Sequence, residues 1–172
     1  MADTSRQDEL FQQAAADYGA AVARLARAYE ADPDLSRDLV QDIHVALWRS
    51  FEKFKADCSL RTWVFRVAHN TAVSHVIRER RRRGQTMVSL EEIETLPLTA
   101  SRGDRQQLLD QLLAMIRRLK PIDRQVILAY LEDMDAAAIG AITGLSPGNV
   151  ATKVHRIKKI LAQQIRAGEV RR

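Results

Sequence analysis

Apolar residues recur at steps of three and four along most of this chain, and no stretch alternates apolar and polar residues as a strand requires. The first run extends from Phe11 to Tyr29, and the second from Leu35 to Phe51. This spacing places apolar side chains on one face of an α-helix. Only 7 Gly and 4 Pro interrupt the 172 residues, and unbranched helix-favouring side chains are abundant. The pattern predicts an all-α protein.

Capping residues mark where several of the expected helices begin. Asp32 followed by Pro33 places a side-chain acceptor, and then a proline, where the start of a helix favours them. Ser59 offers the same kind of cap to a third helix that runs to the arginines at 80–83. Pro121 opens a further helix beyond the middle of the chain.

The helical periodicity fades between Gly84 and Gly103. This segment contains two glycines, a proline and three glutamates, a composition typical of a linker. We therefore predict two small helical domains, residues 1–84 and 105–172, joined by a flexible linker over residues 85–104.

Basic residues gather in two blocks far apart in the sequence. Residues 59–83 hold seven arginines against one glutamate, and residues 143–172 hold seven basic residues against one glutamate. The segments between and before these blocks are net acidic. Two basic blocks, each at the end of an expected helix, favour contact with nucleic acid over a merely solvated surface.

A helix-turn-helix is predicted by the stretch MDAAAIGAITGLSPGNVATKVHRIKKIL. A short alanine-rich helix ends at Gly144, which turns the chain at little cost because it lacks Cβ. Ser146 then caps a second helix with Pro147 at its first position. The arrangement is that of a helix-turn-helix, with a helical hairpin bearing a solvated basic face as the alternative.

The second helix of this motif carries polar side chains opposite its apolar stripe. Asn and Arg side chains can pair with base edges, and Lys and Thr suit phosphates. The candidate DNA contacts are Ser146, Asn149, Thr152, Lys153, His155, Arg156 and Lys159, with Lys158 at the border.

The first domain has a second candidate surface. Trp63, Arg66 and Asn70 share one side of the expected third helix, at positions i, i+3 and i+7. A ring, a guanidinium and an amide on one stripe can stack on an unpaired base and bond its edge. For Trp63 alone, burial between helices is the better interpretation.

Three segments together resemble bacterial sigma factors of the extracytoplasmic-function group: DLVQDIHVALWRSFEKF, SLRTWVFRVAHNTAVSHVIRERRRR and LSPGNVATKVHRIKKIL. The resemblance extends from about Leu10 to Ile165, in matching order and spacing. It implies a subunit that joins core RNA polymerase, through its β′ clamp and β flap, and directs promoter recognition, DNA melting and transcription initiation. An anti-sigma protein is a further partner that the resemblance makes plausible.

The resemblance also implies roles for individual residues. It assigns Asn70 to the capture of a flipped base of the −10 element, and the segment from Ser146 to Lys159 to the −35 element. A specificity loop is expected to begin over His75–Glu79. The residues implied in polymerase docking are Asp38, Gln41, Asp42 and Trp48, and those implied in −10 binding and melting are Trp63, Arg66, Asn70, His75, Arg78, Arg80 and Arg81. The chain departs from the family's common residues at Gly148–Thr152, His44 and His69, and these departures bear on the promoter sequence more than on the class.

Other functions find less support. We expect no cofactor, no metal and no enzymatic activity, since neither a phosphate-binding loop nor ligand spacing is present. A single cysteine, Cys58, and the lack of an apolar run near 18 residues predict a cytoplasmic protein without membrane insertion. A stand-alone helix-turn-helix regulator that acts without core polymerase is the alternative function.

Overall fold

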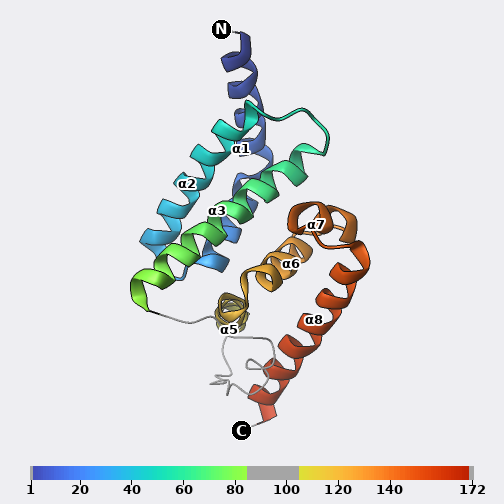
Figure 1. Cartoon of the computed structure of the whole chain (residues 1–172). Helices are drawn as coiled ribbons and strands as arrows, with labels where there is room; N and C mark the ends of the chain where they lie inside the picture. The colour runs from blue at the N-terminus through green and yellow to red at the C-terminus, as the bar shows by residue number, and fades with distance from the viewer. Residues whose placement is uncertain (1, 85–104, 171–172) are drawn as a thin grey trace. The chain divides into compact units, whose positions relative to one another are not determined.

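The computed structural model describes residues 2–84 and 105–170. The described residues form seven α-helices and no strand, as the periodicity predicted (Figure 1). The chain divides into two compact units, one of residues 1–84 with 141–144 and one of residues 85–140 with 145–172. The expected linker, residues 85–104, lies outside the described residues.

Three long helices build the first unit: α1 (Ala2–Tyr29), α2 (Pro33–Phe51) and α3 (Leu60–Arg83). Each packs against the other two, and in Figure 1 they run side by side in blue to green. The predicted starts are confirmed, because the Asp32 carboxylate accepts from the N–H groups of Asp34 and Leu35 and the Ser59 hydroxyl accepts from Thr62 N–H. At the other end of α3, Gly84 adopts φ 65°, which suits a residue without Cβ.

The core of the first unit is apolar with a few polar side chains inside it. Leu39, Ile43 and Leu47 of α2 are buried, as are Val64, Phe65 and Ala68 of α3, and the two helices pack against each other. His69, at 0% exposure, contacts the Tyr29 hydroxyl through Nδ1 at 3.0 Å. The bond pairs His69 Nδ1 with Tyr29, while His69 Nε2 is buried without a hydrogen-bond partner among the described residues, which makes this position costly.

Four helices follow residue 104: α5 (Arg105–Arg118), α6 (Pro121–Leu131), α7 (Ala136–Thr143) and α8 (Pro147–Val170). They belong to the second unit except for the last residues of α7, 141–143, which the division above assigns to the first. Helix α6 packs against α5 and α8, and α5 also contacts α8. The buried Arg124 guanidinium donates to the carbonyls of Arg117 and Leu119, which lie at the end of α5 and just beyond it. Such bonds satisfy carbonyl groups that the end of a helix leaves open.

No helix in the described part of the chain is both long enough and apolar enough to cross a membrane.

Candidate nucleic-acid interface

The turn between α7 and α8 has the features that the sequence predicted. Gly144 adopts φ 77°, in the left-handed region. The Ser146 hydroxyl accepts from Asn149 N–H at 3.3 Å at the start of α8, and Asp135 accepts from Ala138 N–H at 2.7 Å at the start of α7. A Cβ on Gly140 would lie 2.6 Å from Leu145 O, so this glycine lets α7 approach the turn closely.

Helix α8 has one buried and one exposed face. Val150, Val154 and Ile157 are buried in the second unit. The predicted DNA contacts on the exposed face are Ser146, Asn149, Thr152, His155, Arg156 and Lys159. The Thr152 hydroxyl donates to Gly148 O at 3.0 Å. The amide of Asn149 and the cations of Arg156 and Lys159 leave α8 with a polar surface of the kind that enters a major groove.

Lys153, unlike the exposed residues named above, is partly buried and bonds to another helix. Its ammonium lies 2.6 Å from the carboxylate of Asp123 on α6, and the Asp123 side chain is only 7% exposed. The sequence analysis assigned Lys153 to DNA and gave Asp123 no role. The structure instead joins the two in an ion pair that holds α8 to α6, and nothing in the local sequence pattern indicates a contact across 30 residues.

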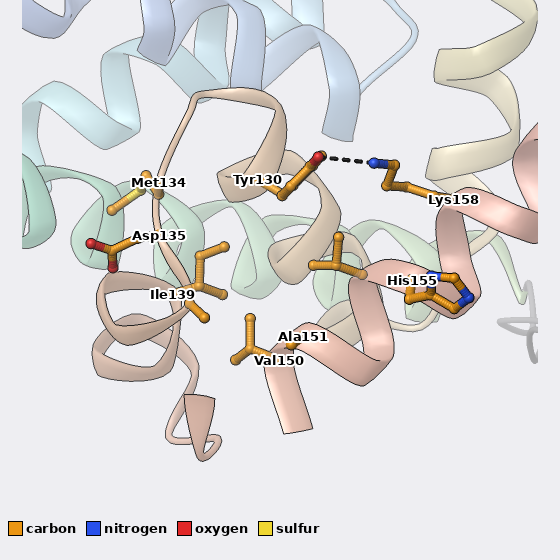
Figure 2. Close-up of a pocket in the computed structure, with 10 residues that line it drawn as sticks. Tyr130, Met134, Asp135, Ile139, Val150, Ala151, His155 and Lys158 are labelled. Atoms are coloured by element: carbon orange, nitrogen blue, oxygen red, sulfur yellow. Dashed lines mark hydrogen bonds between the residues drawn. The ribbon is translucent and has the colours of Figure 1, made fainter. Parts of the chain in front are cut away.

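A cavity of about 360 Å³ lies beside α8, among α6, α7 and α8 (Figure 2). Met134, Ile139 and Val150 are among its apolar walls, and His155 and Lys158 belong to its lining. The Lys158 ammonium donates to the Tyr130 hydroxyl at 2.9 Å, drawn as a dashed line in the figure, and lies 4.8 Å from the ring centroid. Lys158 thus links α8 to the end of α6, and Lys153 links α8 to the start of α6.

On α3, the predicted stripe is partly exposed. Asn70 is exposed, and the Arg66 guanidinium lies 5.9 Å from the centroid of the half-buried Trp63 ring. Trp63 also donates from Nε1 to Ser50 Oγ at 2.9 Å and packs against Phe54, with ring centroids 5.2 Å apart. Trp63 is therefore anchored between helices, and Asn70 is the most accessible polar group of the three.

His75 requires a correction. Its side chain is buried, and Nε2 lies 3.3 Å from the Glu30 carboxylate, so the imidazole is not on the surface where DNA contact was expected. The expected loop over His75–Glu79 is helical, because α3 continues to Arg83. The burial of His75 could not be predicted from the local sequence, because its acidic partner, Glu30, lies 45 residues away.

The arginines near the end of α3 have distinct surroundings. Arg78 is exposed and lies 3.6 Å from the Asp42 carboxylate of α2. Burial lowers the pKa of the half-buried Arg80, while Arg81 is exposed. The end of α3 therefore presents a basic surface with one ion pair back to α2.

Burial lowers the pKa of two histidines in the first unit. Desolvation lowers the pKa of His69 to about 3, so its imidazole is neutral at physiological pH. Desolvation also lowers the pKa of His44, whose ring meets Phe11 edge-on at 5.8 Å between centroids. Both residues therefore belong to the packing of the helices.

The outer face of α2 carries the residues that the resemblance assigned to polymerase docking. Asp38, Gln41 and Asp42 are exposed, and Trp48 is 38% exposed. Val45, which is 50% exposed, adds an apolar group beside them. No group of three or more metal-ligating side chains occurs among the residues that the structure describes.

Comparisons with known proteins match both units. The family model for sigma-70 region 2 matches residues 15–82, and the model for sigma-70 region 4 matches residues 109–161. The RNA polymerase sigma factor CnrH of Cupriavidus metallidurans is 30% identical over 166 residues, which cover 88% of this chain and 84% of CnrH. The chain belongs to the extracytoplasmic-function group of sigma-70-family sigma factors. As a sigma factor it serves RNA polymerase in promoter recognition and transcription initiation.

Further proteins that are similar to this chain are also sigma factors. The extracytoplasmic-function sigma-E factor of Escherichia coli K12 is 23% identical over 154 residues, or 84% of this chain and 80% of sigma-E. The structure of CnrH in complex with the cytosolic domain of CnrY has a TM-score of 0.66 at 22% identity and covers 97% of this chain and 99% of CnrH. The structure of RpoE in complex with the anti-sigma factor NepR from Bartonella quintana has a TM-score of 0.68 at 21% identity. It covers 91% of this chain and 96% of RpoE. The matches confirm the fold and do not favour a stand-alone regulator.

Proposed function

We propose that this sigma factor divides promoter recognition between its two units, with α8 reading the −35 element as duplex and α3 capturing bases of the −10 element. The observation that carries the proposal is the exposed polar face of α8, capped by Ser146 and backed by a buried apolar stripe. An α-helix presented in this way fits the major groove, where Asn pairs with adenine and Arg with guanine. Asn149 and Arg156 are the candidates for such base contacts.

In the first unit, Asn70 is the proposed base-capturing residue. Its amide is exposed on α3, and Arg66 and the basic end of the helix lie on the same element. An amide can bond the edge of an extruded base, and neighbouring cations can hold its backbone. Captured bases offset the few kcal/mol that unstacking costs, so strand opening needs no fuel from this subunit.

Docking on core RNA polymerase is proposed to use α2. Its outer face combines exposed carboxylates and an amide with a partly exposed tryptophan, the kind of residue that dominates binding energy at protein interfaces. The β′ clamp is the expected partner of this face, and the β flap that of the second unit. The subunit carries out no chemistry of its own in this proposal, because bond formation belongs to the polymerase.

We further propose a cytoplasmic protein held inactive by an anti-sigma protein. Two structural neighbours were solved in complex with other chains, one of them described as an anti-sigma factor. A protein that works on promoter DNA meets its template in the cytoplasm, which supports the compartment.

Asn149→Ala tests the reading role of α8. A lost bidentate base contact costs about 1–3 kcal/mol, so the polymerase holoenzyme should bind the −35 element about 5- to 150-fold more weakly and discriminate less at one base pair. Gln163→Ala is the matched control, because Gln163 is also exposed on α8, beyond the segment assigned to the −35 element. Binding is measured by fluorescence anisotropy on a promoter library. Equal affinity and unchanged base preference in the Asn149 variant would reject the assignment.

A further inference from the structure

The first turns of α1 contact the C-terminal end of α2 through several bonds. Asp8 accepts from the indole N–H of Trp48 at 2.8 Å, and the Gln7 side chain donates to the backbone carbonyl of Trp48 at 2.6 Å. Arg6 donates to Phe54 O at 3.5 Å. One turn further along α1, Phe11 meets the ring of His44. The beginning of α1 is therefore fastened to one edge of the outer face of α2.

These contacts come from residues outside the segment that the family model matches. That match begins at residue 15, while Arg6, Gln7, Asp8 and Phe11 precede it. The family model therefore does not include this part of α1, although the CnrH structure covers 97% of the chain. The bonds converge on Trp48, which has a backbone and a side-chain bond to adjacent residues of α1.

The bond to Asp8 fixes an exposed aromatic ring. Trp48 is 38% exposed, and Val45, three residues earlier on α2, is 50% exposed, so the two form an apolar patch on the surface. An indole has a single polar N–H, and a charged acceptor for it selects one ring orientation. A ring that is already oriented loses less conformational freedom when a partner binds it.

We propose that residues 5–11 of α1 and the outer face of α2 form one docking surface for core RNA polymerase, in which Asp8 is a positioning residue that orients Trp48. This inference rests on the proposed role of α2 in polymerase docking. It adds the start of α1 to that surface. It also gives Asp8 a role in affinity for polymerase that is separate from holding the fold, because its bond lies at the exposed rim of the unit.

The test compares full-length variants for affinity to core RNA polymerase by fluorescence anisotropy. Because the partner must then order a Trp48 ring that Asp8 no longer orients, Asp8→Ala should bind about three- to tenfold more weakly. Asp8→Asn keeps an acceptor oxygen and should stay within about twofold of the wild type. Asp17→Ala is the matched control, since Asp17 is exposed on the same helix.

A spectroscopic readout separates positioning from general stability. With 5-fluorotryptophan in the chain, the ¹⁹F resonance of Trp48 should move in Asp8→Ala. The resonance of Trp63, whose N–H bonds Ser50, should stay in place, and the melting temperature should be unchanged. Movement of both resonances with a lowered melting temperature would mean that Asp8 only supports the fold, and would overturn the inference.

Trp48→Ala distinguishes the two proposals. If this variant binds polymerase as tightly as the wild type, the docking role of α2 is wrong, and the inference about Asp8 loses its basis. If Trp48→Ala weakens binding but Asp8→Ala does not, docking by α2 stands and the positioning role of Asp8 is refuted. Weaker binding by both, with affinity restored in Asp8→Asn, supports the inference.

Discussion

The ammonium of Lys153 reaches from α8 to the buried carboxylate of Asp123 on α6. An ionised carboxylate that has lost its partner in the interior is costly, so this pair matters more for the fold than an exposed pair of the same length. The neighbouring Lys159 is exposed on the same helix, at a position where a phosphate contact is expected. Two lysines six residues apart are therefore expected to play different roles.

Lys153→Ala should lower the free energy of unfolding of the second unit by about 1–3 kcal/mol, because it leaves the Asp123 carboxylate buried without its partner. Lys159→Ala should leave stability within about 0.5 kcal/mol of the wild type and reduce the salt dependence of promoter binding by about one unit of slope. Urea unfolding followed by circular dichroism and binding at several salt concentrations provide both quantities. A stable Lys153 variant with a reduced salt slope would return Lys153 to the phosphate-contacting set.

His69 links stability of the first unit to pH. Burial lowers its pKa from 6.5 to about 3, so the folded protein keeps the imidazole neutral where the unfolded chain binds a proton. Because the unfolded state then holds more protons, this contribution to stability is fully present above about pH 6.5 and is lost as the pH falls toward 3. The slope from one such group is at most about 1.4 kcal/mol per pH unit.

Replacing the pair by Tyr29→Phe with His69→Leu should flatten this slope below pH 6.5. The double change removes the titrating group and its partner together, which avoids leaving one of them buried and unpaired. Both of the chain's 2 Trp, Trp48 and Trp63, lie in the first unit, so tryptophan fluorescence in urea reports its unfolding alone. The same pH slope in wild type and double variant would contradict the assignment.

At the scale of elements, the packing of α7 against the start of α8 depends on a glycine within α7. A Cβ at Gly140 would come 2.6 Å from the backbone oxygen of Leu145, and backbone atoms cannot move away as the end of a side chain can. Gly19, in the middle of α1, has no atom within 4 Å of the same position. The two glycines form a natural pair for comparison.

Gly140→Ala should destabilise the second unit by about 1–3 kcal/mol and weaken promoter binding, because α7 must shift from the turn that precedes α8. Gly19→Ala should stabilise the first unit by about 0.5–1 kcal/mol, since alanine favours a helix interior. Thermal unfolding by calorimetry measures both effects. A Gly140 variant as stable as the wild type would mean that the turn adapts without cost.

The starts of several elements followed from the sequence alone. Asp32, Ser59 and Ser146 cap helices where the local pattern placed them, because capping depends on residues within one turn. Contacts between residues far apart in the chain could not be predicted from the sequence. The bonds between Asp8 and Trp48, His75 and Glu30, and Lys153 and Asp123 join residues 30 to 45 positions apart. Their partners are set by helix packing, which periodicity does not specify.

In the candidate site too, local features could be predicted from the sequence and long-range contacts could not. The exposed polar face of α8 was predictable, since side chains opposite a buried stripe point outward. The resemblance assigned His75 to −10 binding, but the side chain is buried, and an acidic partner makes its burial tolerable. The packing of Trp63 between helices is confirmed, and its assignment to −10 binding stays a prediction. Its bond to Ser50 was the part that the sequence could not reveal.

At the scale of the whole molecule, we propose that the two helical units carry surfaces with different tasks. In this proposal helix α8 binds closed duplex, Asn70 on α3 binds an extruded base, and the outer face of α2 binds the polymerase. The proposal requires all three contacts at once during initiation, so neither unit is expected to act without the polymerase. The central claim is therefore that the chain opens promoter DNA only as part of the holoenzyme.

Strand opening, followed by the fluorescence of 2-aminopurine within the −10 element, tests this claim most directly. The wild-type chain with core RNA polymerase should raise the signal, while either one alone should not. Asn70→Ala should reduce opening and retain duplex binding, because a bidentate contact between an amide and a base is worth about 1–3 kcal/mol. Ser74→Ala, exposed on the same helix, should behave as the wild type. Full opening by the Asn70 variant would contradict base capture, and no opening by wild-type chain with core polymerase would contradict the account as a whole.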